Sequence, residues 1–148
     1  MVDARYKDSV DETAQTVLHA WRWNPAGEFA VLYLSKDADC CMREKLRQIG
    51  GNPNFLPPQF VGMFDVKLWH CLDLTSPKVL KALGLTREEL ISPDDFTKPQ
   101  AVARAARQAG FEALIAPPAI GENCETLVVF KDKIAPPSSC ILAPTGRQ

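Results

Sequence analysis

The chain has 148 residues, of which 46% are apolar and 24% charged, and its formal net charge is -1. This size and composition are those of one globular domain with a sizeable core. The near-neutral charge supplies neither a basic surface for nucleic acid nor a polybasic patch for an anionic membrane. No segment is apolar enough for a membrane span or a signal peptide, so a cytoplasmic protein is expected.

The cysteines are odd in number and contain no CxxC pair, and only two histidines accompany them. These spacings do not match those of zinc sites, so no metal site is expected. Thiols in a cytoplasmic protein are usually reduced. We therefore expect all five to be reduced and mostly buried: Cys40, Cys41, Cys71, Cys124 and Cys140.

The first half of the chain predicts two strands and a helix. A polar lead-in is followed by an apolar run at 29–34, which is typical of a buried strand. A helix over 38–49 follows, with Asp37 as its N-cap. The proline-rich segment 52–60 indicates an ordered loop or a flap. Alternating apolar residues over 64–74 predict one half-buried strand.

The second half predicts three helical segments and two more strands. Pro77 suits the first position of a short helix, and Thr86 has the capping-box spacing to Glu89. The alanine-rich segment 99–109 is the clearest helix. Residues 111–116 and 126–130 read as strands.

The order of these elements predicts an α+β fold with a mixed, mostly antiparallel sheet and flanking helices. No repeat or composition break divides the chain, so residues 1–148 are expected to form a single domain. Its core should span about 5–134. The proline- and serine-rich residues 135–148 are expected to form a loosely attached tail.

No spacing motif names an enzyme class, but three chemically capable residues recur at intervals of eleven: Arg22, Tyr33 and Glu44. The fork of donors on Arg22 suits a phosphate or a carboxylate, although a structural arginine is the simpler interpretation. Tyr33 is either a core tyrosine with a satisfied hydroxyl or a wall for a flat ring.

Glu44 is the most informative of the three. Helical periodicity places it opposite the apolar stripe of 38–49, facing solvent and within pairing reach of Arg47 and Gln48. A catalytic role therefore requires another segment to cover that face. His70, on the apolar side of its strand, is more simply a core residue.

The chain resembles the RES domain family, whose members are typically toxins of Xre–RES toxin–antitoxin pairs. The matching features are "RWNPAG" (22–27), "VLYLS" (31–35), Glu44, "EALIAPP" (112–118) and "GENCETLVVF" (121–130). They follow the family's order over most of the chain. The resemblance implies an ADP-ribosyltransferase-like fold and degradation of NAD+ by hydrolysis or phosphorolysis.

The resemblance also implies roles for particular residues. Glu44 would stabilise the cation that develops on the ribose, Arg22 would hold the diphosphate or the ribose, and Tyr33 would pack on nicotinamide. The remaining matches, implied to bind NAD+, are Arg5, Tyr6 and Asn123. NAD+ would be a substrate rather than a cofactor. The implied partner is a helix-turn-helix antitoxin of Xre type.

One departure from the family leaves the activity open. The family's serine follows a proline after the strand that "EALIAPP" matches, and Pro118 or Ala119 stands there. Proline supplies no donor and no side-chain acceptor. The alternatives are a catalytically impaired domain that binds NAD+ or ADP-ribose, and an enzyme that transfers ADP-ribose to protein. The acceptor of the ribosyl group, whether water, phosphate or protein, stays undetermined.

Overall fold

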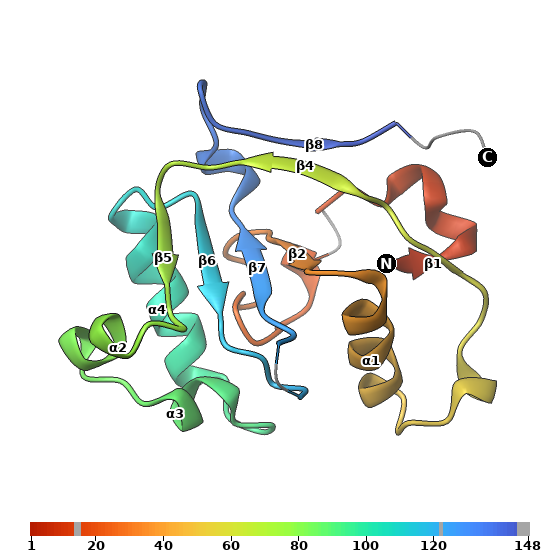
Figure 1. The fold of residues 1–148 in the computed structure, drawn as a ribbon, viewed down its shortest axis with the longest axis horizontal. Helices are drawn as coiled ribbons and strands as arrows, with labels where there is room; N and C mark the ends of the chain where they lie inside the picture. The colour runs from red at the N-terminus through yellow and green to blue at the C-terminus, as the bar shows by residue number, and fades with distance from the viewer. Residues whose placement is uncertain (14–15, 122, 145–148) are drawn as a thin grey trace.

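The computed structural model describes residues 1–13, 16–121 and 123–144, and its centre is a four-stranded sheet (Figure 1). The strands lie in the order β2-β7-β6-β5. The two pairs that involve β7 are antiparallel, whereas β5 and β6 are parallel. The expected α+β class with a mixed, mostly antiparallel sheet is confirmed. The bounds are β2 (Leu32–Ser35), β5 (Cys71–Asp73), β6 (Ala113–Ala116) and β7 (Thr126–Val129).

Three helices cover one face of this sheet: α2 (Pro77–Leu83), α3 (Arg87–Ile91) and α4 (Thr97–Gln108). The apolar side chains between the sheet and these helices form the larger core cluster, which includes Trp23, Val31, Leu74, Leu90, Leu114, Val128 and Phe130. Removing this apolar surface from water is the main source of the fold's stability.

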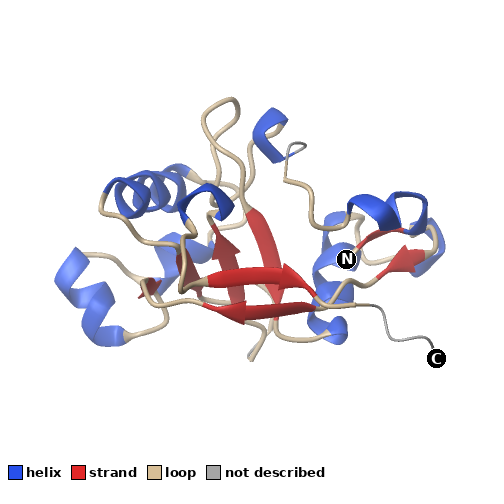
Figure 2. Ribbon diagram, turned by 90° about the horizontal axis from the view of Figure 1, so that it is seen from above, coloured by secondary structure: helices blue, strands red, loops and turns tan. Residues whose placement is uncertain are grey.

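A two-stranded antiparallel ribbon contributes to the opposite face: β4 (Phe64–Lys67) and β8 (Ser139–Leu142). Figures 1 and 2 show the two strands running side by side across the sheet. Phe64 and Cys140 pack from this ribbon against the second core cluster, around Leu32 and Val129. The expectation of a loosely attached tail is therefore wrong for residues 139–142, because their backbone pairs with β4.

Helix α1 (Ala38–Gln48) and the pair of strands β1 (Val2–Asp3) and β3 (Gln59–Phe60) lie beyond the edge strand β2 (Figure 1). Helix α1 follows β2 directly, and β1 pairs with β3 in a second two-stranded sheet. Short 3₁₀ segments complete the described chain: η1 (Ala4–Ser9), η2 (Thr16–Leu18), η3 (Pro53–Phe55) and η4 (Lys131–Lys133). Within the described ranges no helix is long and apolar enough to cross a membrane.

The predicted helix starts are confirmed at the level of individual hydrogen bonds. The Asp37 side chain accepts from the Cys40 amide at 2.8 Å, which satisfies a donor that the first turn leaves unpaired. Thr86 and Glu89 form the full capping box at the start of α3. Local side-chain chemistry therefore sets where these helices begin.

The single strand predicted over 64–74 is wrong, because the chain turns between β4 and β5. The buried carboxylate of Glu112 accepts hydrogen bonds from the amides of Trp69 and His70, at 3.0 and 3.2 Å. His70 is consequently exposed at the turn instead of lying on an apolar face. Hydrogen bonds from Ser138, and then from the Trp69 and His70 amides, lower the pKa of Glu112 although its burial acts in the other direction.

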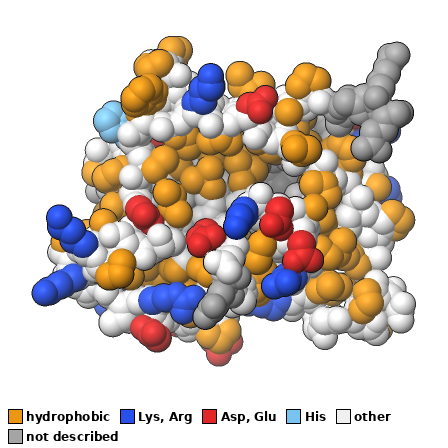
Figure 3. All heavy atoms as spheres, in the orientation of Figure 1, with side chains coloured by type: hydrophobic (Ala, Val, Ile, Leu, Met, Phe, Trp, Pro, Cys, Tyr) orange, Lys and Arg blue, Asp and Glu red, His pale blue; other side chains and the backbone are white. Residues whose placement is uncertain are grey.

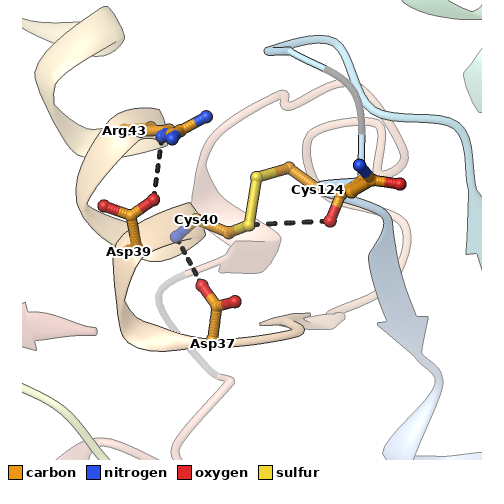
Figure 4. The surroundings of a disulfide bond; sticks show 6 residues. Asp37, Asp39, Cys40, Arg43 and Cys124 are labelled. Carbon is orange, nitrogen blue, oxygen red and sulfur yellow. Dashed lines mark hydrogen bonds and ion pairs between the residues drawn. A yellow bond between two sulfur atoms is a disulfide. The ribbon is translucent and has the colours of Figure 1, made fainter.

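A disulfide joins Cys40 on α1 to Cys124 on the loop before β7 (Figure 4). Both cysteines are buried, and their Cα atoms lie 5.5 Å apart. The expectation that all cysteines are reduced is wrong for this pair, because the fold brings together two residues 84 positions apart. Cys41, Cys71 and Cys140 carry free thiols.

Glu112→Gln should lower the free energy of unfolding by about 2 kcal/mol at neutral pH, because hydrogen bonds to a charged acceptor are lost. A folded-state pKa below the reference of 4.5 contributes stability above that pH and loses it as the pH falls. The difference between wild type and variant should therefore shrink at about pH 3. Urea unfolding at both pH values measures it, with the exposed Glu88→Gln as control. Equal stability at neutral pH contradicts the role of Glu112.

Cys124→Ser should lower the free energy of unfolding by about 2–4 kcal/mol, because the cross-link restricts the unfolded chain. A dithiol reductant should lower the Tm of wild type towards that of the variant and leave the variant unchanged. Cys41→Ser is the matched control, since it removes a neighbouring free thiol. A wild-type Tm insensitive to complete reduction would argue against this contribution.

Candidate functional site

The structure brings together the three residues spaced by eleven. Arg22 follows η2, Tyr33 lies on β2, and Glu44 lies on α1. Burial lowers the pKa of the Arg22 guanidinium, and the nearby charge of Arg47 lowers it further, while Glu44 and Tyr33 act to raise it. These charges interact across one small region, where three separate segments meet. No hydrogen bond or ion pair joins the three residues directly in the described part of the chain.

Arg22 has a structural role, and one of its nitrogens makes no hydrogen bond to the described residues. Its Nη1 donates to the carbonyls of Leu90 and Ser92, at 3.1 and 2.5 Å, and so holds the end of α3. Its guanidinium carbon lies 4.9 Å from the centre of the Phe96 ring. The Nη2 atom, however, is buried without a hydrogen-bond partner. A buried donor without an acceptor is costly, so this nitrogen is an unexplained feature of the Arg22 environment.

The Tyr33 hydroxyl belongs to a buried hydrogen-bond network. It donates to Asn24 Oδ1 at 2.6 Å and accepts from the Trp23 amide at 3.1 Å. Asn24 is fully buried, and its amide donates to the carbonyls of Thr16 and His19. Burial raises the pKa of Tyr33, so this phenol stays neutral. The hydroxyl is structural, and the half-buried ring is the part left to contact a ligand.

Glu44 lies where helical periodicity predicts. Its Oε1 accepts from Arg47 Nη2 at 2.6 Å and from Gln48 Nε2 at 3.4 Å. The side chain is 34% exposed, which leaves its carboxylate accessible to a ligand. The second carboxylate oxygen makes no hydrogen bond to the described residues. A ligand hydroxyl can therefore bind Glu44 without breaking its pair with Arg47.

Among the residues that the structure describes, neither Arg5 nor Tyr6 forms a hydrogen bond or ion pair with Arg22, Tyr33 or Glu44. Arg5 forms an ion pair with Asp3 at 2.8 Å, and its guanidinium carbon lies 5.7 Å from the centre of the Tyr6 ring. Both are exposed, the Arg5 side chain at 76% and Tyr6 at 59%. The N-terminal amine is close to Cys41 and Lys45 of α1, which places β1 against the flank of the helix that carries Glu44.

A cavity of about 210 Å³ lies beside the position of the family's serine. Asn123, with a left-handed φ of 64°, lines it together with Pro118. Arg87 Nη2 donates to the Pro118 carbonyl at 3.4 Å. The lining is completed by residues that follow β5, a residue of α2 and residues of the loop between β6 and β7: Leu74, Thr75, Leu80, Pro117 and Glu125.

A hydroxyl does line this cavity, but it comes from Thr75. Because β5 and β6 run parallel, the residues that follow them, Thr75 and Pro117, lie at the same end of the sheet. The Thr75 hydroxyl donates to the Asp73 carboxylate. Ser138, by contrast, hydrogen-bonds Glu112, which precedes β6, and so lies at the opposite end of that strand. It does not replace the missing serine.

The cavity and the Arg22 cluster are held together by two connections. The disulfide fixes the loop that carries Asn123 to α1, a few residues from Glu44 (Figure 4). Helix α3 carries Arg87 in its first turn, and Arg22 binds the carbonyls at its other end. Within the described ranges no group of three or more metal-ligating side chains is present.

Sequence reasoning missed Arg87, Glu125 and Thr75. Arg87 and Glu125 stand in segments that predict only a helix start and a strand entrance. The one available signal was the possible parallel pairing of the strands that precede Thr75 and Pro117, which a single sequence does not establish. Each residue becomes informative only through the cavity that all three line.

Tyr33→Phe should lower the free energy of unfolding by about 1–2 kcal/mol, because it leaves the buried Asn24 carbonyl without its donor. The ring remains, so affinity for a ligand that stacks on it should change by less than about threefold. Thermal unfolding and ligand titration measure the two effects separately. Tyr33→Leu is the contrasting variant, because it removes the ring as well. Loss of binding in Tyr33→Phe without loss of stability would contradict this division of roles.

The chain is similar to known proteins in sequence and in fold. The chain is 38% identical over 111 residues to the probable NAD(+) phosphorylase Rv3189 of Mycobacterium tuberculosis strain H37Rv, covering 74% of this chain and 52% of that protein. It is 30% identical over 105 residues to the NAD(+) phosphorylase MbcT of Mycobacterium bovis, covering 68% and 56%. The chain thus spans about half the length of the curated relatives it matches.

The fold is similar to that of a chain in the crystal structure of the M. tuberculosis MbcT–MbcA toxin–antitoxin complex. The TM-score is 0.73 at 25% sequence identity, over 87% of this chain and 72% of that one. The profile of the RES domain family matches residues 5–146, nearly the whole sequence. This match, together with the relatives above, establishes that the chain belongs to the RES domain family.

Proposed function

We propose that this chain degrades NAD+ by cleaving the bond between nicotinamide and ribose. The observation that carries the proposal is the convergence of Arg22, Tyr33 and Glu44, in a chain whose relatives are named NAD(+) phosphorylases. An arginine guanidinium, a half-buried aromatic ring and a partly exposed carboxylate match the phosphate, the nicotinamide and the ribose of a nicotinamide nucleotide.

The proposed reaction breaks the C1′–N bond of the nicotinamide riboside unit. Nicotinamide leaves as a neutral molecule and takes the bonding electron pair, so its departure needs no acid. Positive charge builds on the ribose, and the Glu44 carboxylate stabilises it or orients the ribose hydroxyls. A phosphate oxygen then bonds to C1′ in phosphorolysis, whereas water bonds there and loses a proton in hydrolysis. The names of the relatives favour phosphate.

The other residues of the site would bind and orient NAD+. The Arg22 guanidinium would hold the diphosphate or the ribose, and the Tyr33 ring would pack on nicotinamide. Arg5, Tyr6 and Asn123 remain candidates for binding NAD+. Of these three residues, Asn123 lines the cavity. NAD+ would act as substrate, and no resident cofactor is proposed.

A catalytically impaired NAD+- or ADP-ribose-binding domain is the second candidate. It is favoured by Pro118, which brings no hydroxyl to the cavity where the family has a serine. The Thr75 hydroxyl in the same cavity weakens this alternative, because it offers an acceptor at a nearby position. Transfer of ADP-ribose to a protein would use the same residues and differ only in its acceptor.

An antitoxin protein is the proposed partner, by analogy with the toxin–antitoxin complex of the structural neighbour. On the face seen in Figure 3, apolar side chains are exposed among acidic and basic ones. Large exposed apolar residues flank or belong to the β4–β8 ribbon: Met63, Trp69 and Ile141. Such surface suits a protein interface. The helix-turn-helix, Xre type of that partner stays a prediction.

Glu44→Ala should reduce NAD+ loss by at least about 100-fold, because it removes the group that faces the developing cation. Purified protein is incubated with NAD+, with and without inorganic phosphate, and nicotinamide and the ribosyl product are quantified. The product distinguishes phosphorolysis from hydrolysis, and a labelled protein band would reveal protein transfer. Glu88→Ala, an exposed carboxylate on α3, is the matched control.

Two outcomes would contradict the proposal. NAD+ bound but unconsumed by wild type would establish the impaired-domain alternative. Turnover equal in wild type and Glu44→Ala would remove Glu44 from the reaction. Circular dichroism of each variant verifies that it is folded.

A further inference from the structure

We propose that the cavity beside Pro118 binds the adenylate half of NAD+, with Arg87 on the phosphate and Glu125 on the ribose hydroxyls. This inference rests on the proposed function, because it assigns the half of the substrate on which Glu44 does not act. It names two residues, Arg87 and Glu125, that the sequence motifs leave out.

The size and walls of the cavity fit part of a dinucleotide. Its volume of about 210 Å³ is below the range of roughly 300–1,000 Å³ of sites that enclose a whole drug-sized ligand. It is therefore suited to one half of NAD+. Four of its lining residues are buried and have apolar side chains: Leu74, Leu80, Pro117 and Pro118. These flat and branched surfaces suit the faces of a purine ring.

The two charged residues of the cavity, Arg87 and Glu125, carry opposite charges. Neither Arg87 nor Glu125 forms an ion pair within the part of the chain that the structure describes. Arg87 makes one long hydrogen bond, to the Pro118 carbonyl, which leaves most of its donors for a phosphate. A ligand that satisfies both residues must present an anion and hydrogen-bond donors. A nucleotide does so with its phosphate and its ribose hydroxyls.

Helix α3 connects the two arginines. Arg22 holds the carbonyls of Leu90 and Ser92 at one end, and Arg87 stands in the first turn. The rise from Arg87 to Ile91 is about 6 Å along the helix axis. With the nicotinamide ribose at Arg22 and Glu44, the second nucleotide would lie at Arg87, which lines the cavity.

The same arrangement gives a basis for selecting NAD+ over NADP+. A carboxylate beside the adenosine ribose accepts hydrogen bonds from its 2′- and 3′-hydroxyls. A 2′-phosphate in the same place would meet the negative charge of Glu125, and like charges at short range repel. Glu125 is therefore a specificity-determining residue in this inference.

Arg87→Ala should weaken the binding of AMP, measured by calorimetry, by at least roughly tenfold, and should raise the KM for NAD+ similarly with little change in kcat. Inhibition by nicotinamide, which lacks the adenylate half, should not change. Arg87→Lys should restore part of the affinity, because it restores the charge without the fork. Arg104→Ala is the matched control, since this arginine pairs with Glu28 away from the cavity.

Glu125→Gln should lower the ratio of kcat/KM for NAD+ to that for NADP+ by at least roughly tenfold, because it removes the repulsive charge. A purely structural role for Glu125 would change both substrates equally. Thermal unfolding verifies that each variant keeps the fold.

The outcomes separate this inference from the proposed function. Glu44-dependent NAD+ loss with unchanged AMP affinity and KM in Arg87→Ala would overturn the adenylate site and leave the function standing. AMP binding that falls tenfold in Arg87→Ala, in a protein that never consumes NAD+, would support the site and overturn the function. A wild-type protein that does not bind AMP would overturn the inference outright.

Discussion

The buried amide of Asn24 is the interaction on which the geometry of the site depends. It donates to two carbonyls of the preceding segment, Thr16 and His19, and its oxygen accepts from the Tyr33 hydroxyl. The turn that carries Arg22 is thereby fixed to strand β2 on one side. Gln100 donates to the carbonyls of Trp21 and Asn24 and fixes it to α4 on the other. A fully satisfied buried network of this kind holds one arrangement and excludes others. Arg22 is consequently positioned to hold the end of α3 through the carbonyls of Leu90 and Ser92.

Local chemistry made part of this fold predictable. The helix starts at Asp37 and Thr86 follow from side chains that bond the first-turn amides, and these interactions need no distant partner. The failures occurred where distant residues decide. The turn between β4 and β5 depends on Glu112, and the pairing of β8 depends on β4. The hydrophobic periodicity of 64–74 does not indicate that this segment contacts Glu112 or β8.

In the candidate site, too, some features follow from the local sequence and others depend on distant residues. The pairing of Glu44 with Arg47 and Gln48 follows from helical periodicity, and the structure confirms it, although Glu44 is only partly exposed. The convergence of Glu44 with Arg22 and Tyr33 depends on packing between segments, and only the family resemblance indicated it. The cavity of Arg87 and Glu125 depends on strand order, which a single sequence leaves undetermined. The loss of one serine hydroxyl is likewise informative only when the neighbouring strand is known to bring Thr75 to the same end of the sheet.

The position of the disulfide has a consequence for how the chain finds its fold. Cys40 follows β2 by a few residues, and Cys124 precedes β7 by fewer, so the cross-link stands next to the pair Ser35 and Thr126. Through the backbone, β2 and β7 are among the most distant partners in the sheet. Along the covalent path through the disulfide, β2 and β7 are separated by about as few residues as the two strands of a β-hairpin. In the oxidised chain the disulfide closes that long loop before folding. Pairing β2 with β7 therefore costs no more loop-closure entropy than a contact between neighbouring residues in the sequence. The reduced chain must search for the same register over its full length.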